Sequence, residues 1–510
     1  MKIRKLRKKA VREARMKQTT SYRNDRRFLG HPLGLGTISG MTLCQGFANY
    51  GMSSILIYFL YATAAEGGLG FSKANAAQFI SLYSTLSFLC GILGSYLADR
   101  LMGIRKAIRI GYFIKTLGYA LLAIPGGGVP MYLGSQFLLL MSAVSMGSSL
   151  DALTGKLYEK GDDRRDGGYS ILYIMNNVGA VAPVITGTIA QMMGYRVGFL
   201  FAAILQGIGF VLYILTEKKL FGDTGVTPDD EAPADEKKKL IGRLIAGIAV
   251  LAVVVAILFK VGVFTPTSFA NTVSTIAIFI PIIYLIFIAK SDKTTAQDGK
   301  KLKMFFALFL CNSLAMMVWN QSTGILAVYA DERVNLNFFG FQLTPAAFQT
   351  VPAVYAVVLG IIVSTLWLKL GKRQPDAPMK FGLGTMLWGA GPLFMIIPFL
   401  LFSPSEKVSP MWLLIFYLFI ILGEAITSPT GPSCTAAIAP KAFTVQMFTI
   451  WKLSQSTGAG LSTLAVNFYK EGSEVAYFLG IGLVTCLIGL AVCIMHKKIA
   501  SEMQLEEETK

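Results

Sequence analysis

Four charged side chains lie inside long apolar stretches of this chain: Lys115, Asp151, Glu424 and Lys452. An ionised group in an apolar membrane segment is costly, so it usually faces a water-filled cavity or a partner of opposite charge. Glu424, in the middle of such a stretch, is therefore a candidate functional residue. The alternative is an ion pair between Glu424 and Lys452 that only locks two helices together. On helices that meet near Pro440, these two residues lie at depths that differ by about 6 Å.

Lys115 and Asp151 leave the same choice open. Each is a candidate substrate-binding or coupling group, and mutual pairing within one helical bundle is the alternative. The two histidines, His31 and His496, lie at the ends of the apolar stretches and not within them. The six cysteines have neither the spacing of a zinc site nor that of a disulfide framework. The sequence therefore predicts no cofactor, no metal site and no catalytic residue.

The stretches that carry these residues are long enough to cross a membrane. The 510 residues are 54% hydrophobic and only 15% charged, whereas soluble domains carry about 25% charged residues. Windows of about 20 apolar residues recur along the chain, each of which fits the thickness of a bilayer. We therefore expect an all-α polytopic membrane protein. Its fourteen predicted membrane helices are 37–62, 75–98, 107–124, 130–154, 169–193, 197–216, 240–260, 271–289, 303–330, 345–368, 380–402, 410–436, 443–467 and 474–496.

The basic residues predict how these helices are oriented. With the N-terminus inside the cell, 39 of the 47 Lys and Arg residues fall on the cytoplasmic side and 6 on the opposite side. Such a bias is what the positive-inside rule describes. The net charge of +18 therefore indicates topology and not a nucleic-acid partner, because the basic residues lie in the short links and not on one polar face. Both termini are predicted to be cytoplasmic.

The chain also divides along its length. A polar stretch that contains the sequence DTGVTPDDEAPADEKKK follows the sixth predicted helix, and two helices nearly free of polar side chains come after it. This pattern predicts two bundles of six helices with a two-helix insertion between them, as in transporters built from two related halves. The expected parts are a basic cytoplasmic arm (1–33), an N-terminal bundle (34–216), linkers with the inserted helices (217–302), a C-terminal bundle (303–496) and a cytoplasmic tail (497–510).

Four separated motifs resemble one known family. They are the link 94–106, which contains Asp99, Arg100 and Gly103; the segment 155–180; the segment 423–433 with the later Trp451; and Phe47, Tyr50 and Gly51 in the first helix. These motifs and their order along the chain resemble the proton-dependent oligopeptide transporter (POT/PTR) family of the major facilitator superfamily. The chain is similar to a divergent bacterial-type member of that family. The resemblance implies a monomeric secondary active transporter of the cell inner membrane. Such a protein moves di- and tripeptides by alternating access.

The resemblance also implies roles for single residues. Glu424 matches the acid that receives the amino terminus of the peptide. Asp99 and Arg100 match residues that hold one conformational state by charge-assisted contacts. The remaining residues implied to contact substrate are Gln45, Tyr50, Asn177, Asn320, Gln321, Trp451 and Lys452. Helix–helix hydrogen bonding is the alternative for the asparagines, and core packing is the alternative for the two aromatic residues.

Several positions depart from the pattern of the family. Thr42, Gln45 and Gly46 replace a motif of two acids and an arginine, and Gly147 replaces a lysine. A further acid is replaced by Asn320. Most of the proton relay is therefore missing, which leaves coupling to Glu424 or Asp151, or to none. The carboxylate clamp is missing too, so Lys115 or Lys452 is expected to meet the carboxyl end of a peptide.

Three other functions stay open on the sequence alone. A uniporter or exchanger of another small amphiphile would explain the missing clamp. A membrane-embedded enzyme that acts on lipid or cell-wall precursors would need a catalytic cluster at a membrane face. Its only candidate is Asp162 with Asp163, and a solvated loop paired with the adjacent arginines is the preferred explanation of that pair. A transporter-like receptor without flux is the third.

Overall fold

The computed structural model describes residues 23–159, 162, 164–228, 232–263, 265–338, 340–428, 430–440 and 443–503. The predicted basic arm lies outside the described residues as far as residue 22. Nearly all of the described chain is helical, and the only strands in it are β1 (Asn337–Phe338) and β2 (Phe341–Gln342), which form a short antiparallel hairpin. The predicted all-α fold class is confirmed.

The chain forms two compact units. The first comprises Met1–Met52 and Cys90–Val263, and the second comprises Ser53–Leu89 and Phe264–Lys510. The division passes through the middle of two helices, α2 (Leu33–Tyr61) and α3 (Lys73–Leu97). The hairpin that joins these helices, with the short helix η1 (Ala64–Glu66), therefore belongs to the second unit.

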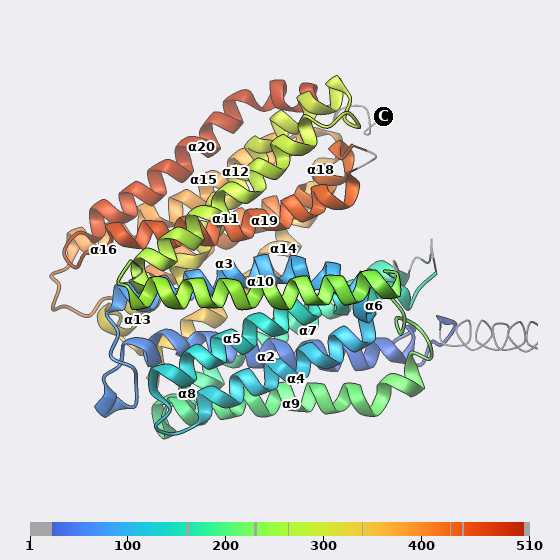
Figure 1. Cartoon of the computed structure of the whole chain (residues 1–510). Helices are drawn as coiled ribbons and strands as arrows, with labels where there is room; N and C mark the ends of the chain where they lie inside the picture. Colours follow the sequence, from blue (N-terminus) through green and yellow to red (C-terminus); the bar gives the residue numbers. More distant parts are fainter. Residues whose placement is uncertain are drawn as a thin grey trace, which may run out of the picture. The chain divides into compact units, whose positions relative to one another are not determined.

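The first unit is built around α4, which lies alongside α5 and α9 (Figure 1). Its core includes the buried aromatic residues Tyr112, Tyr158, Tyr213 and Phe221. Beyond α2 and α3, the helices of this unit are η2 (Ala98–Met102, a π-helical turn), α4 (Ile104–Ala123), α5 (Gly128–Met146), α6 (Ser149–Lys156), α7 (Arg164–Gly179), α8 (Ala182–Met193), α9 (Tyr195–Leu220) and α10 (Ala234–Lys260).

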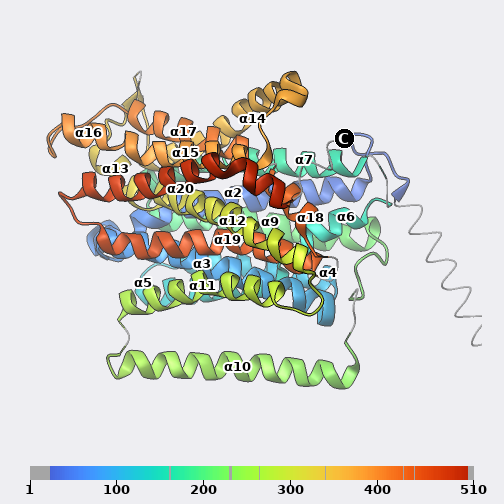
Figure 2. The ribbon, with the colours of Figure 1, turned by 90° about the horizontal axis from the view of Figure 1, so that it is seen from above.

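In the second unit α15 lies alongside α17 and α20, and α12 packs against α19 (Figure 2). Its core includes Phe305, Phe309 and Phe381. Its helices are α11 (Pro266–Ala289), α12 (Ala296–Thr323), α13 (Ile325–Arg333), η3 (Pro345–Thr350), α14 (Val351–Leu370), η4 (Gly371–Arg373), α15 (Ala377–Phe394), α16 (Ile396–Leu401), α17 (Met411–Thr427), α18 (Thr430–Ile438), α19 (Thr444–Ala465), η5 (Val466–Phe468) and α20 (Glu474–Met503).

Local sequence explains where several of these helices begin and break. Thr265, Thr295 and Asp376 cap α11, α12 and α15 by accepting a hydrogen bond from a backbone N–H of the first turn, which satisfies a donor that the helix cannot pair. Gly147 has a φ of +47° between α5 and α6, a conformation that glycine adopts at little cost. The predicted helix 130–154 is therefore two helices.

All fourteen predicted membrane helices are found as helices, although five of them are broken into two. Among the described residues, eleven helical segments are long and apolar enough to cross a membrane. The other three, α2, α4 and α19, have 29, 20 and 22 residues. They are long enough to cross, so their composition and not their length distinguishes them from the eleven.

Candidate functional site

Glu424 lies near the end of α17, beside a close approach of two helices. A Cβ atom on Gly423 would lie 2.7 Å from the carbonyl oxygen of Gly384, so α15 and α17 touch through their backbones. Glu424 is the next residue, and its side chain is half-buried. Within the described part of the chain, its carboxylate has neither an ion pair nor a hydrogen bond. A carboxylate in this position is free to bind a ligand.

The ion pair between Glu424 and Lys452, the alternative to ligand binding by Glu424, is absent from the described residues. Trp451 explains the absence, because its ring packs 6.0 Å from that of Phe305 and 5.8 Å from that of Phe381. Successive helical residues point about 100° apart. With Trp451 turned into this core, Lys452 is turned away from it and its side chain is exposed. Lys452 stays a predicted substrate-binding residue, without this partner.

Trp451 itself is a packing residue in this structure. A Cβ atom on Gly431 would overlap its indole ring, so α18 and α19 can approach only because residue 431 is glycine. The ring also borders the aromatic core of the second unit. The contacts of Trp451 are those of a core-packing residue, which was the alternative to a role in the wall of a substrate pocket.

Asn320 and Gln321 are buried in α12 and make internal hydrogen bonds. The Asn320 amide donates to the carbonyl oxygen of Met316 at 2.8 Å. The Gln321 amide donates to the hydroxyl of Ser462 at 2.8 Å and accepts from that of Tyr477 at 2.7 Å. Gln321 therefore ties α12 to α19 and α20. Helix–helix bonding, and not an open ligand position, is what these contacts show.

In the first unit, α2 and α7 approach each other at Gly46 and Gly179, where a Cβ atom on Gly179 would lie 2.8 Å from the backbone of Gly46. This contact places Tyr50 within reach of α7, and its hydroxyl accepts a hydrogen bond from Asn176 at 3.1 Å. Asn177, the predicted residue, donates to the carbonyl oxygen of Tyr173 at 2.9 Å.

Gln45 differs from Tyr50 and Asn177 because its side-chain oxygen makes no hydrogen bond in the described structure. This oxygen is buried. An unsatisfied buried acceptor costs free energy. Gln45 therefore has a buried oxygen available to accept a hydrogen bond from a ligand, as do Ser39 and Thr42 on the same helix.

Mutual pairing of Lys115 with Asp151, one of the two alternatives left open by the sequence, is not formed among the described residues. The ammonium of Lys115 instead lies 5.8 Å from the centre of the Tyr119 ring, and Tyr119 donates a hydrogen bond to Asn49 at 3.3 Å. The Asp151 side chain is exposed on α6. Gly147 has a φ of +47°, and the helix break there separates α6 from α5 and changes the direction of the chain before Asp151. This break explains why the pair is not formed.

Asp99 and Arg100 lie in the π-helical turn between α3 and α4. Arg100 forms an ion pair with Glu236 at 3.2 Å, and its carbonyl oxygen accepts from the N–H of Ala232 at 3.1 Å. The N–H of Arg105 donates to Gly225 at 2.9 Å. The polar linker after α9 therefore runs along this turn and holds it.

Sequence reasoning missed a buried carboxylate close to this turn. Glu217 on α9 is 3% exposed and forms ion pairs with Arg105, at 3.7 Å, and with Arg109 on α4. In the sequence it stands before Lys218 and Lys219, which suggests a solvated helix end. Only the packing of α9 against α4 reveals that it is buried.

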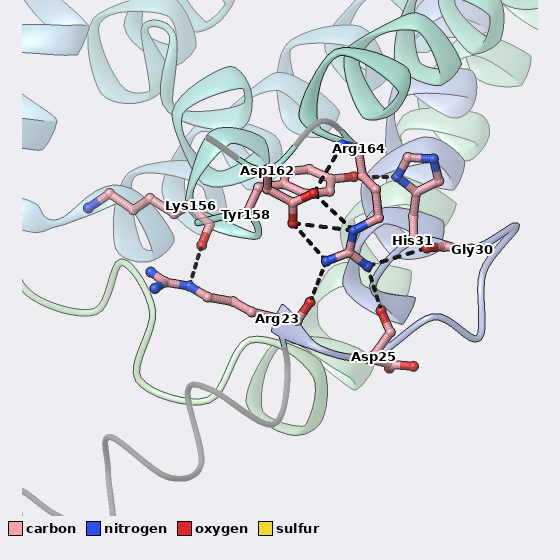
Figure 3. A network of polar contacts seen from close by, with 8 residues as sticks. All are labelled: Arg23, Asp25, Gly30, His31, Lys156, Tyr158, Asp162 and Arg164. Atoms are coloured by element: carbon pink, nitrogen blue, oxygen red, sulfur yellow. Dashed lines mark hydrogen bonds and ion pairs between the residues drawn. The ribbon is translucent and has the colours of Figure 1, made fainter. Parts of the chain in front are cut away.

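A second missed cluster joins the residues before α2 to the start of α7 (Figure 3). The Arg164 guanidinium pairs with Asp162 at 2.7 Å and donates to the carbonyl oxygens of Arg23, Asp25 and Gly30. A hydrogen bond of 2.9 Å joins His31 Nδ1 to the Tyr158 hydroxyl. Burial raises the pKa of Tyr158 to about 12, which keeps that hydroxyl protonated.

Two more pKa values in this cluster follow from its charges. The Arg27 side chain holds the pKa of Asp25 at about 2, so Asp25 is ionised at neutral pH. Burial, with Arg164 close by, lowers the pKa of His31, so His31 is neutral there. Asp162 pairs with Arg164 and not with a catalytic partner. The described residues do not support the alternative of an enzyme with Asp162 as a catalytic acid.

The hairpin that belongs to the second unit is fixed there by polar contacts. Lys73 forms ion pairs with Glu332 and, at 3.2 Å, with Glu471. The Tyr61 hydroxyl donates to Asp331. Deeper along α3, the hydroxyls of Ser81 and Ser462 are 3.1 Å apart. These contacts close one end of the second unit.

The architecture and its charges define a class of protein. The described residues form membrane-length helices with few charges between their ends, and they hold no group of three or more His, Cys, Asp or Glu residues that could bind a metal ion. Unpaired polar groups inside such helices are typical of proteins that handle polar solutes. The chain is a multi-pass membrane protein of the transporter class.

Comparison with known proteins identifies the family. The family model described as "POT family" matches residues 105–484. The chain is 34% identical to the "Uncharacterized transporter YclF" of Bacillus subtilis, over 94% of this chain and 96% of that one. It is also 34% identical to the "Di-/tripeptide transporter" of Lactococcus lactis subsp. cremoris, over 94% and 98%. The chain therefore belongs to the POT family, whose members are transporters and not enzymes.

Solved structures agree with this assignment. The crystal structure of peptide transporter POT in complex with sulfate matches with a TM-score of 0.91 and 35% identity, over 95% of this chain and 99% of that one. A POT family transporter in complex with 5-aminolevulinic acid matches with a TM-score of 0.88 and 29% identity, over 93% and 98%. The predicted major facilitator fold is confirmed by these likenesses.

Proposed function

We propose that this protein carries di- and tripeptides across the cytoplasmic membrane by alternating access. The observation that carries the proposal is the 34% identity to a di-/tripeptide transporter over nearly the full length of both chains. The unpaired carboxylate of Glu424 supports it, because every unmodified peptide presents an ammonium group.

Within this proposal Glu424 receives the amino terminus of the peptide, and Lys115 or Lys452 meets its carboxylate. Gln45 and Tyr50 supply hydrogen bonds to the peptide backbone. The other predicted substrate-binding residues lie near the substrate, and their internal contacts hold the neighbouring helices in position. They are Asn177, Asn320, Gln321 and Trp451.

The remaining predictions are proposals of the same kind. Residues 34–216 and 303–496 form the two bundles that exchange access, and residues 217–302 link them. Both termini are cytoplasmic, the protein acts as a monomer, and Asp99, Arg100 and Asp151 belong to the parts that change between states. Protons drive uptake through Glu424 or Asp151.

A second substrate class has an observation of its own. The POT family transporter bound to 5-aminolevulinic acid is 29% identical to this chain. That ligand also carries an ammonium and a carboxylate, so the group that binds a peptide amino terminus would serve it equally. A carrier of such small amphiphiles, working as a uniporter or exchanger, is the alternative proposal.

Uptake into proteoliposomes tests both proposals and the coupling. Labelled dipeptide, tripeptide and free amino acid are compared with and without an imposed pH gradient, acid outside. We expect dipeptide to accumulate and the gradient to increase its uptake. Absence of dipeptide accumulation and of counterflow would sink the peptide assignment. Binding that stabilises the protein without any flux would indicate the receptor alternative.

A further inference from the structure

One face of α4 exposes a row of residues that changes from basic to apolar along the helix. Lys106, Arg109, Phe113 and Leu117 are spaced by three or four residues and therefore share a face. Lys106 is exposed, and Arg109, Phe113 and Leu117 are 46%, 49% and 42% exposed. The whole row from Lys106 to Leu117 has the length of about three helical turns, and its apolar part, Phe113 to Leu117, has the length of about one.

The neighbouring helix α9 carries a matching row. Figure 1 shows α4 and α9 side by side, and the rings of Phe113 and Phe210 are 5.7 Å apart. On α9, Val211 and Ile214 are 52% and 37% exposed, and Lys218 follows one turn after Ile214 and is exposed. The basic ends of both rows coincide, because Arg109 pairs with Glu217.

The buried Glu217 carboxylate holds this basic end in place. It pairs with Arg105 and Arg109 and is itself 3% exposed, so the half-exposed guanidinium of Arg109 is fixed at the surface. The basic end of the two rows has more basic than acidic residues, because its only acids within residues 104–109 and 217–223 are Glu217 and Asp223. The basic residues of this end are Arg105, Lys106, Arg109, Lys218 and Lys219.

We propose that the α4–α9 surface is a binding site for one anionic phospholipid. The headgroup phosphate is bound by Lys106, Arg109 and Lys218, and an acyl chain lies along Phe113, Leu117 and Ile214. Basic residues at the membrane boundary attract anionic headgroups in general. A fixed guanidinium beside exposed apolar side chains favours an amphiphile over a soluble anion, because a soluble anion would leave those side chains uncovered. This site is separate from the proposed transport function.

Lipid binding to the purified full-length protein tests the proposal. The protein in a neutral detergent is titrated with phosphatidylglycerol, with phosphatidylcholine and with inorganic phosphate, and retained ligand is counted by native mass spectrometry. Thermal unfolding is followed in parallel. The test variant is the double substitution Lys106→Gln and Lys218→Gln, at two exposed positions. The control is Lys497→Gln with Lys498→Gln, which removes the same charge at the exposed end of α20.

We expect one phosphatidylglycerol to be retained and to raise the unfolding temperature, and neither phosphatidylcholine nor phosphate to do so. At about 1 kcal/mol for each lysine near a membrane surface, the double variant should bind about 25-fold more weakly, and the control pair should remain within about twofold of wild type. Equal retention of phosphatidylcholine, equal stabilisation by phosphate, or equal loss in both double variants would overturn the proposal.

Discussion

Two charges at the ends of membrane-length helical segments are held in ion pairs, whereas two charges farther inside such segments are not. Glu217 pairs with two arginines, and Lys73 pairs with two glutamates. Glu424 and Lys115, by contrast, have no ion pair within the described part of the chain. A buried charge without a partner costs several kcal/mol. We infer that the paired charges hold the structure, and that the unpaired charges are retained because a substrate or proton pairs with them.

The largest expected effect is the loss of Glu217. The substitution Glu217→Ala leaves two arginines without their carboxylate, one of them 7% exposed, and should lower the free energy of unfolding by about 3 kcal/mol. Denaturant unfolding in detergent measures this loss, with Glu159→Ala, at an exposed position of the same unit, as control. A loss below about 1 kcal/mol would mean that this pair does not hold the structure.

Lys115 should behave in the opposite way. The substitution Lys115→Met removes a charge that has no carboxylate partner, so the free energy of unfolding should stay unchanged or rise. Dipeptide uptake should fall about tenfold if the ammonium binds the peptide carboxylate, which corresponds to a loss of about 1.4 kcal/mol. Lys115→Arg, which keeps the charge, should retain more uptake than the methionine variant. A clear loss of stability in Lys115→Met would break the comparison.

A smaller effect is expected at Lys73. Its ion pairs are partly exposed, with Glu471 76% exposed, and such pairs contribute about 1 kcal/mol at most. The substitution Lys73→Gln should therefore change the rate of dipeptide exchange by about fivefold or less, and leave the folded state intact. Lys470→Gln removes a charge at the same end of the second unit and serves as the control. Equal effects of the two would show that the ion pairs of Lys73 do not matter.

The smallest expected effect concerns pH and the cluster in Figure 3. The pKa of His31 is lowered in the folded protein, so protonation favours the unfolded cluster. The stabilisation is present above the ordinary pKa of about 6.5 and is lost as the pH falls through the lower, folded value. The hydrogen-exchange protection factors of residues 23–33, which correct for the pH dependence of intrinsic exchange, should therefore fall below about pH 6.5. His31→Gln should remove this dependence and His496→Gln should not.

The positions of the membrane helices could be predicted because the signal is strong. Twenty apolar residues between charged links leave few alternatives to a membrane helix. The breaks at Gly147 and Gly324 could not be found in the same way, because glycine is tolerated inside membrane helices. Which glycine breaks a helix depends on its neighbours. A Cβ atom on Gly147 would, for example, overlap the backbone of Ser95 on α3.

The candidate site could be predicted only in part. Glu424 stands out because it is a lone acid in an apolar stretch. The alternative, a pair with Lys452, is not formed because depth along a helix does not determine direction around it, and Trp451 fixes that direction. Glu217 escaped notice because neighbouring lysines make it look solvated. Its burial follows from contacts between helices that are about 100 residues apart in the sequence.

The most direct test of the account is dipeptide uptake by the Glu424→Gln variant. Glutamine keeps the size of the side chain but cannot balance an ammonium charge, and a hydrogen bond to a charged group contributes about 1.5–3 kcal/mol. We predict that uptake falls at least about tenfold while thermal unfolding stays like that of wild type and of the Glu159→Gln control. N-acetylation of the dipeptide should weaken its binding to wild type but not to the variant. Uptake by Glu424→Gln at the wild-type rate would contradict the account.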